Sequence, residues 1–252
     1  ALYEDIKTNG YNGSPILVWF DEDGFIHLYD GYHRLSIMKY LGIEAKVVCK
    51  TEWTGIGGVV GKDFPLVEEL MQVPPEGNWL YQPVDDDRVK GWGLARGHTP
   101  ERLDHIAQNL VGKTVLDIGC SEGYFSRELA KRGYKVTAID NNKGLLASAR
   151  YLSTISSIDV DYHLVDDWKE FVDQNGHFDN ILFLSVLHND MKVIGVEEGL
   201  KKLETLRGKA GRLFLEGPYY EWGESTGKHG FTGKPLFDFS AKESVVKMEE
   251  VL

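Results

Sequence analysis

The stretch Val115-Leu-Asp-Ile-Gly-Cys-Ser-Glu-Gly-Tyr-Phe-Ser126 decides the fold, and Val136-Thr-Ala-Ile-Asp140 follows it along the chain. Each opens with a short apolar run, which indicates a buried strand. The first run leads into a loop with Gly119 and Gly123, and glycine lets the backbone approach a ligand because it has no Cβ. The second run ends in Asp140, an acid that can accept two hydrogen bonds from a ribose diol. Together they predict a nucleoside site.

The composition of this loop argues against a dinucleotide ligand. The dinucleotide fingerprint is G-x-G-x-x-G, and this chain has Ser121 where the second glycine would stand. Asp117, just before the loop, would repel a phosphate but suits an ammonium group. S-adenosylmethionine carries an ammonium group and a ribose and has no phosphate, so it is the cofactor that these residues predict.

The segment Leu116-Asp-Ile-Gly-Cys-Ser-Glu-Gly123 resembles the first motif of the class I S-adenosylmethionine-dependent methyltransferases, which usually have glycine in place of Ser121. The resemblance implies that the loop backbone lines the methionine part of the cofactor. It also implies that Asp117 lies near the amino group and that Asp140 takes the ribose hydroxyls. The cofactor-binding candidates are Asp117, Gly119, Cys120, Ser121, Gly123, Asp140, Asn141, Asp166, Asp167 and Ser185.

Two further elements of that family follow in the required order. Tyr162-His-Leu-Val-Asp-Asp-Trp168 resembles the element whose acid accepts from the adenine amino group, so Asp166 or Asp167 is the candidate. Phe178-Asp-Asn-Ile-Leu-Phe-Leu-Ser-Val-Leu-His188 resembles the fourth strand and its loop. The resemblance covers about residues 112–217. Simpler interpretations stay open: the run Asp140-Asn-Asn-Lys143 as an ordinary helix N-cap, since Asp and Asn both cap helices well, and the two adjacent acids as solvated loop residues.

The order of elements predicts a Rossmann-like α/β fold, with a mainly parallel sheet and helices on both faces. Helix 122–132 should pack Phe125, Leu129 and Ala130 against the sheet. The expected strands are 114–118, 135–139, 161–165, 179–184 and 211–216, and the expected helices are 100–110, 122–132, 142–153, 167–174 and 195–207.

Composition favours a globular cytoplasmic enzyme. The chain has 252 residues, of which 42% are hydrophobic and 27% are charged. No apolar run approaches the ~20 residues of a membrane helix, and no metal-ligand spacing is evident. The two cysteines, Cys49 and Cys120, favour a reducing compartment because one lies in the cofactor loop. A net charge of −11 disfavours nucleic acid as a partner.

The N-terminal part resembles the ParB/sulfiredoxin-type fold, a small α+β domain. The resemblance rests on Pro15-Ile-Leu-Val-Trp19, Tyr29-Asp-Gly-Tyr-His-Arg-Leu-Ser-Ile-Met-Lys-Tyr-Leu-Gly42 and Ala45-Lys-Val-Val48. It implies a phosphate or nucleotide site at the start of a helix, with Asp30, Gly31, His33 and Arg34 as candidates. A scaffold role is equally open, in which Asp30 caps the helix and Arg34 pairs with a carboxylate.

These resemblances predict three parts: residues 1–53 as the ParB/sulfiredoxin-like segment, 54–98 as an irregular connector or lid, and 99–252 as the methyltransferase domain. Methyltransferases of this class usually continue beyond the fifth strand with a helix and an antiparallel strand pair. Here only a helix over Ala241 to Leu252 is expected, so the C-terminal strands are expected to be missing.

The leading function is O-methylation of a small molecule or saccharide. His188, just past the fourth strand, is the candidate general base, or a capping or packing residue. Glu216, at the end of the fifth strand, is a second candidate for base or substrate orientation. The loop from Gly217 to Gly230 includes Tyr219 and His229, and its aromatic residues suit sugar rings. The alternatives are methylation of nucleic acid or a nucleotide-linked substrate, and a non-catalytic S-adenosylmethionine-binding module.

Overall fold

The computed structural model describes residues 2–11, 13–45, 47–49, 79–89, 91–94 and 98–216. The chain divides into two compact units. One contains Ala1–Ala95 and Ala147–Ser157, and the other contains Arg96–Leu146 and Ile158–Leu252. The division between residues 95 and 96 falls close to the expected start of the methyltransferase domain. The assignment of residues 147–157 to the first unit is a feature that a linear division of the sequence does not anticipate.

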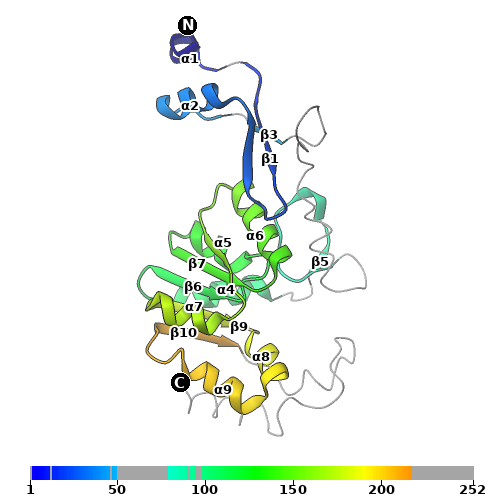
Figure 1. Ribbon diagram of the computed structural model, residues 1–252, viewed down its shortest axis with the longest axis vertical. Coiled ribbons are helices and arrows are strands. Elements are labelled where there is room, and N and C mark those ends of the chain that lie inside the picture. Colours follow the sequence, from blue (N-terminus) through cyan, green and yellow to red (C-terminus); the bar gives the residue numbers. More distant parts are fainter. Residues whose placement is uncertain are drawn as a thin grey trace. The chain divides into compact units, whose positions relative to one another are not determined.

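The second unit is built on a five-stranded parallel sheet in the order β10-β9-β6-β7-β8 (Figure 1). Its strands are β6 (Thr114–Ile118), β7 (Lys135–Asp140), β8 (Asp161–Leu164), β9 (Phe178–Leu184) and β10 (Ala210–Glu216). The chain runs outward from β6 to β8, and then returns to place β9 on the other side of β6. Such a reversal of strand order creates a crevice at the carboxyl ends of the two central strands, which is where open α/β sheets bind ligands.

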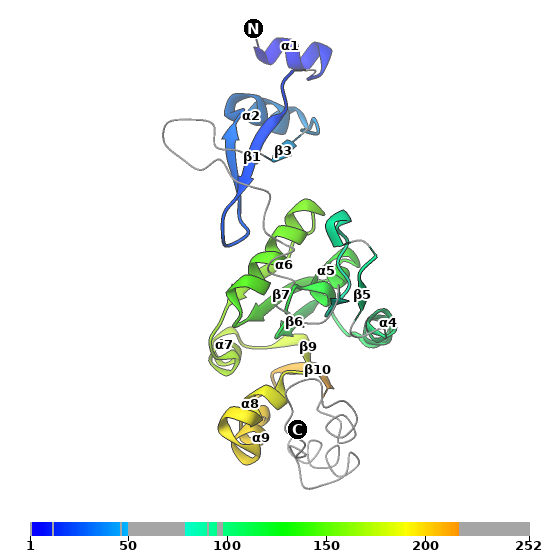
Figure 2. The ribbon, with the colours of Figure 1, turned by 90° about the vertical axis from the view of Figure 1, so that its right-hand side faces the viewer.

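Helices cover both faces of this sheet (Figure 2). Because successive strand residues point to opposite faces, Val115 packs with Leu103 and Phe125 on one face, whereas Leu116 packs with Val172 and Leu203 on the other. The first face carries α4 (Thr99–Asn109), α5 (Tyr124–Lys131) and the beginning of α6 (Lys143–Ile155), and the second carries α7 (Trp168–Asn175), α8 (Leu187–Ile194) and α9 (Val196–Glu204).

The five expected strands of this sheet are confirmed, as is the burial of Phe125 and Leu129 from helix α5. The loop after the fourth strand is short, comprising Ser185 and Val186, and helix α8, which the sequence did not predict, begins at Leu187. This helix has only eight residues, it lacks a side-chain N-cap, and Gly195 follows it immediately. It therefore carries few of the signals by which a helix is read from sequence.

The first unit contains a small sheet in the order β2-β1-β3, from β1 (Ile16–Phe20), β2 (Ile26–Asp30) and β3 (Val47–Cys49). Strand β1 pairs antiparallel with β2 and parallel with β3. Helix α1 (Leu2–Asn9) precedes the sheet, and α2 (Tyr32–Leu41) links β2 to β3 and stops at Gly42, which has φ 66°. Strand β2, the turn at Gly31, helix α2, the stop at Gly42 and strand β3 thus follow one another in this order.

A second cluster of this unit gathers around the later part of α6. Phe20 and Tyr151 meet edge to face at 4.7 Å between ring centroids, and the Arg150 guanidinium lies 4.7 Å from the Phe25 ring centroid. Gly24, in the turn between β1 and β2, touches the Ala147 backbone so closely that a Cβ there would collide with it. Also here are β4 (Trp79–Leu80), the 3₁₀ helix η1 (Asp87–Val89) and β5 (Gly93–Leu94), of which Leu80, Val89 and Leu94 join the cluster.

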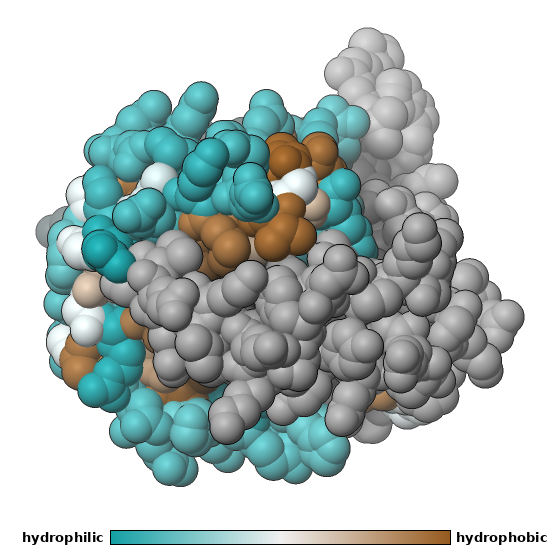
Figure 3. Space-filling model, turned by 90° about the horizontal axis from the view of Figure 1, so that it is seen from below, coloured by the Kyte–Doolittle hydropathy of each residue, from teal (hydrophilic) through white to brown (hydrophobic). Residues whose placement is uncertain are grey.

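Hydrophilic residues cover most of the described surface in the view of Figure 3, and apolar residues gather in a few patches. Among the helices of the described ranges, none combines the length and the apolar character that crossing a bilayer requires. The segment from Gly217 to Gly230, with Tyr219 and His229, lies outside the described residues, as does the helix expected over Ala241 to Leu252.

Candidate cofactor and acceptor site

Asp117 lies at the carboxyl end of the central strand β6 and is almost fully buried, with 3% of its surface exposed. The Ser126 hydroxyl donates a hydrogen bond of 2.5 Å to its Oδ2 atom. Burial, reinforced by the nearby charge of Asp140, raises the pKa of Asp117 from 3.8 to about 6. A buried carboxylate of this kind is stabilised by a cationic ligand, which fits an ammonium group.

The loop after β6 adopts an unusual backbone. Gly119, Ser121 and Gly123 have φ values of 72°, 56° and 73°, all in the left-handed region. The N–H groups of Gly119 and Cys120 both donate to the Ile139 carbonyl of β7, at 2.8 and 3.1 Å. A Cβ on Gly119 would also collide with the Val186 side chain. The loop is thus held against its neighbours in one conformation, and glycine is required for close approach at Gly119.

Asp140, at the end of β7, also holds this loop through a side-chain hydrogen bond. Its Oδ2 accepts from the Ser121 N–H at 2.8 Å, and its Oδ1 accepts from the Asn142 N–H at 2.8 Å. Burial raises the pKa of Asp140, although these backbone hydrogen bonds act to lower it. The cap of α6 is Asn142, whose Oδ1 accepts from the Leu145 N–H at 3.1 Å. Asp140 is therefore not the cap, and carboxylate oxygens can accept further bonds from a diol.

The two adjacent acids after β8 have different surroundings. Asp167 is the N-cap of α7, where it accepts from the Lys169 N–H at 2.9 Å, and it also pairs with Lys202 at 3.0 Å. Burial acts to raise the pKa of Asp167, but the bonds from Lys202 and Lys169 outweigh it and lower that pKa. Asp166 is exposed. Because Asp167 is committed to the helix, Asp166 is the better placed of the two to meet an adenine amino group.

Lys202, on α9, contacts residues at the start of α7 and on α8. Its ammonium group lies 3.3 Å from Asp190 of α8 and 4.8 Å from the Trp168 ring centroid. The Trp168 indole N–H donates to Asp190 at 2.6 Å. The start of α7 and the first turns of α8, which carry the cofactor and base candidates, are therefore both held by one half-buried lysine on α9.

Ser185 and His188 occupy the connection from β9 to α8. Ser185 has φ 61°, a conformation that is uncommon for residues other than glycine, and its N–H donates to the Glu216 carbonyl at 3.0 Å. His188 is half-buried, with its Nδ1 atom directed into the protein. Strand β9 lies next to β6, with Phe183 beside Ile118, so both residues lie one strand away from the cofactor loop.

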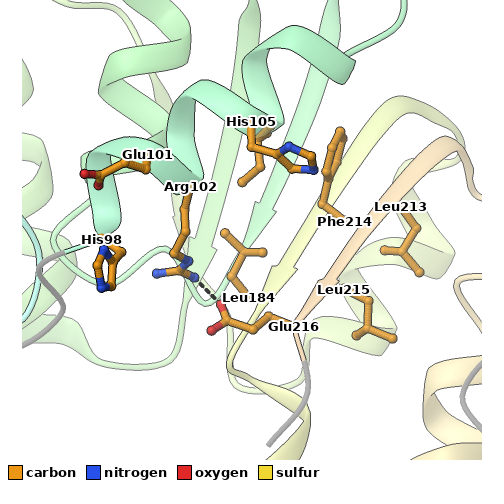
Figure 4. Close-up of a pocket in the computed structure, with 10 residues that line it drawn as sticks. His98, Glu101, Arg102, His105, Leu184, Leu213, Phe214, Leu215 and Glu216 are labelled. Carbon is orange, nitrogen blue, oxygen red and sulfur yellow. Dashed lines mark hydrogen bonds and ion pairs between the residues drawn. The ribbon is translucent and has the colours of Figure 1, made fainter. Parts of the chain in front are cut away.

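Glu216 ends β10 and forms an ion pair with Arg102 of α4 (Figure 4). The Arg102 guanidinium also lies 5.3 Å from the Phe125 ring centroid, at the start of α5. A cavity of about 620 Å³ opens here, lined by His98, Glu101, Arg102, His105, Ile106, Leu184, Leu213, Phe214, Leu215 and Glu216. Sequence reasoning missed α4 as a site element. The spacing of His98, Arg102 and His105, which puts them on one helix face, is the signal that was present.

The turn of the first unit places its four candidate residues on one cavity of about 420 Å³. Arg34 donates to Asp30 at 2.8 Å, to the Tyr11 hydroxyl at 2.8 Å and to the Ser14 carbonyl at 2.7 Å. Gly31, with φ 105°, is the N-cap of α2, and no side chain caps this helix. Arg34 thus pairs with a carboxylate, and the Asp30 side chain does not cap α2.

Cys120 is a free thiol, and burial raises its pKa well above the ordinary value. Such a thiol is a poor nucleophile because the thiolate is the reactive form. Within the described ranges, no three His, Cys, Asp or Glu side chains gather closely enough to hold a metal ion.

The residues that form the cofactor loop and its neighbours are similar to those of known proteins. Residues 115–207, from β6 to the end of α9 and just beyond, match the family model described as a methyltransferase domain. This part of the chain is similar to methyltransferase domains. The match begins within β6, the strand that contains Asp117, and it includes the loop, Asp140 and His188.

Similar sequences include two ubiquinone biosynthesis O-methyltransferases. That of Xanthomonas campestris pv. campestris (strain B100) is 34% identical over 118 residues, which are 46% of this chain and 48% of the relative. That of Pseudomonas paraeruginosa (strain DSM 24068 / PA7) is 39% identical over 92 residues, 36% of this chain and 40% of the relative. This chain thus spans about half the length, or less, of these relatives.

A similar solved structure is that of the bifunctional kinase-methyltransferase WbdD, with a TM-score of 0.55 and 22% identity over 68% of this chain and 39% of that one. A second structure of WbdD gives a TM-score of 0.53 and 28% identity, over 66% of this chain and 34% of that one. The first likeness supports the fold of the parallel sheet and its helices, and carries nothing about substrates.

Proposed function

We propose that this chain transfers a methyl group from S-adenosylmethionine to a hydroxyl of a small molecule or saccharide. One observation carries the proposal. The loop after β6 has residues with left-handed backbone conformation, it follows Asp117 and is hydrogen-bonded to Asp140, and it lies where the strand order reverses. The match of residues 115–207 to a methyltransferase domain supports it.

The residues of this loop fit the chemical groups of the cofactor. The buried Asp117 carboxylate suits the ammonium group, and the pKa of this carboxyl is raised in a way that a cation would reverse. Asp140 is proposed to hold the ribose diol, with Asn141 beside it, and Asp166 the adenine amino group. The backbone at Gly119, Cys120, Ser121 and Gly123 would line the methionine part, with Ser185 on the neighbouring connection.

The cofactor, when bound, supplies an electrophilic methyl group at its sulfonium. What the protein adds is alignment of the acceptor oxygen and removal of its proton. His188 is the proposed base, because it lies one strand from the cofactor loop and an imidazole accepts protons near neutral pH. Glu216 is less suited to that task, since its carboxylate is already paired with Arg102.

Replacing His188 tests this assignment. In His188→Ala we expect S-adenosylmethionine affinity to stay within about twofold and turnover to fall by about 10²–10⁴-fold. His188→Gln should lose as much turnover, because glutamine keeps the polar contacts but accepts no proton. Turnover is measured as radiolabelled methyl transfer to catechol and to methyl mannoside, and affinity by calorimetry. Full activity in both variants would remove His188 as the base.

Two other functions remain as alternatives. A nucleic-acid or nucleotide-linked acceptor requires a cationic surface beside the cofactor mouth, and the net charge of −11 weighs against it. A non-catalytic binding module would bind the cofactor and transfer no methyl group to any acceptor.

The first unit offers a second candidate site, for a phosphate or nucleotide. The observation in its favour is the cavity that Asp30, Gly31, His33 and Arg34 line at the start of α2. The ParB/sulfiredoxin-like character of residues 1–53 belongs to the same proposal. A phosphate would have to replace Asp30 as the partner of Arg34, so Asp30→Asn should strengthen phosphate binding if the site is real.

A further inference from the structure

The cavity between α4 and the ends of β9 and β10 has the size and lining of a small-molecule site. Its volume of about 620 Å³ falls in the range of ligand pockets, about 300–1,000 Å³. Ile106, Leu184 and Phe214 give it an apolar wall, and Arg102 and Glu216 lie at its polar end (Figure 4). The combination of an apolar wall with a few convergent polar groups is typical of sites for small organic molecules.

The register of the sheet places this cavity within reach of the cofactor loop. Glu216 lies beside Leu184, and Phe183 lies beside Ile118, the last residue of β6. Neighbouring strands are about 4.8 Å apart, so Glu216 is about 10 Å from the cofactor strand along the sheet edge. A single six-membered ring with its substituents bridges such a distance. The Ser185 N–H donates to the Glu216 carbonyl at 3.0 Å, so the connection that follows β9 is joined to the end of β10.

The polar groups of the cavity come from one face of α4. His98, Arg102 and His105 follow one another at spacings of four and three residues, and Glu101 points away from the ion pair in Figure 4. Arg102 is fixed twice, by Glu216 and by the Phe125 ring. The two charged side chains stay partly accessible, at 26% and 36%, so a ligand can contact both.

An ion pair at the end of an apolar cavity is complementary to neighbouring hydroxyls. The guanidinium offers five N–H donors in a fixed fork and the carboxylate offers acceptors, so one hydroxyl can donate to Glu216 while the other accepts from Arg102. An anionic ligand fits less well, because the carboxylate of Glu216 is already paired with the guanidinium. Leu184 and Phe214 require that the ring carry an apolar face.

We infer that this cavity binds the methyl acceptor, and that the acceptor is a neutral six-membered ring with vicinal hydroxyls, either a catechol or a sugar. The inference rests on the proposed function and assigns Arg102 and Glu216 to acceptor recognition. In the reaction, an acceptor oxygen forms a bond to the methyl carbon as the carbon–sulfur bond breaks. The electron pair of that bond stays on sulfur, giving S-adenosylhomocysteine, and the hydroxyl proton passes to the general base, for which the proposed function names His188.

Arg102→Met and Glu216→Gln test this inference in the full chain. With catechol and methyl α-mannoside as probes, we expect KM for the ring to rise at least about tenfold in each variant, because each loses a charge-assisted hydrogen bond. The S-adenosylmethionine Kd, measured by calorimetry, should change less than about twofold. Phenol, with one hydroxyl, should be a much poorer acceptor than catechol. Whether catechol or the mannoside is methylated tells the two ring classes apart.

The matched control is Arg132→Met. Arg132, just after α5, pairs at 3.0 Å with Asp104, which is on α4 like Arg102. This ion pair is on the exposed surface and away from the cavity. The Arg132→Met variant should have the KM of the wild type. If Arg102→Met fails to fold, Arg102→Lys replaces it, because lysine keeps the charge but loses the forked guanidinium. Unchanged KM in the Arg102 and Glu216 variants, or no methylation of any ring diol by a chain that binds the cofactor, overturns the inference. A wild-type chain that binds no S-adenosylmethionine overturns the proposed function itself.

Discussion

Asp140→Ala is expected to lower the affinity for S-adenosylmethionine by about 100-fold or more. The change removes both carboxylate oxygens proposed to hold the ribose, and charge-assisted hydrogen bonds contribute about 1.5–3 kcal/mol each. It also removes the acceptor of the Ser121 and Asn142 N–H groups, so the loop loses its tie to β7. The affinity is measured by calorimetric titration of each purified variant.

Two companion variants make this result specific. Asp140→Asn keeps one carbonyl oxygen and should bind the cofactor with intermediate affinity. Asp161→Ala removes an exposed carboxylate at the start of β8, where it contacts only His163 among the ion pairs of the described residues, and should bind as the wild type. Wild-type affinity in Asp140→Ala would contradict the site assignment.

Asp117→Asn is expected to stabilise the ligand-free protein while weakening cofactor binding. The pKa of Asp117 is about 6 in the folded chain against an ordinary 3.8, so ionising it in its buried position opposes folding. The difference, about 6 minus 3.8, corresponds to about 3 kcal/mol at about 1.36 kcal/mol for each pH unit. Asparagine is uncharged, keeps the hydrogen bond with Ser126, and should recover part of that free energy.

The pH dependence follows from the sign of this shift. Between pH 4 and 6 the folded state holds a proton on Asp117 that the unfolded state has lost, so this residue lowers stability as pH rises through that window. The gain from Asp117→Asn should therefore be full above about pH 6 and vanish near pH 4, as measured by denaturant unfolding. Cofactor affinity of the wild type should fall below about pH 6, when the carboxyl is neutral. A variant that is less stable at pH 7 would contradict this account.

The parallel sheet and the cofactor loop could be predicted from sequence because their signals are local. Apolar runs that end in Asp117 or Asp140 are continuous in the chain, and the glycines of the loop stand where the backbone enters the left-handed region. The order of the strands followed from the order of the motifs. Each of these inferences needs only a few neighbouring residues.

The remaining features depend on contacts between distant residues. The ion pair of Arg102 with Glu216 joins positions 114 residues apart, so no local sequence pattern predicts it. The difference between Asp166 and Asp167 arises from Lys202 and the helix start, so the sequence left both open. Helix α8 lacks a capping residue and is stabilised by the burial of Leu187 and Met191, a tertiary effect that outweighs weak local propensity.

The most direct test of the central claim is calorimetric titration of the full chain with S-adenosylmethionine and, separately, with S-adenosylhomocysteine. The account predicts that both bind one site per chain, because the proposed contacts to the ammonium group, the ribose and the adenine are common to the two ligands. Absence of binding by either ligand to a folded chain would contradict it, and would turn attention to the Asp30–Arg34 turn of the first unit.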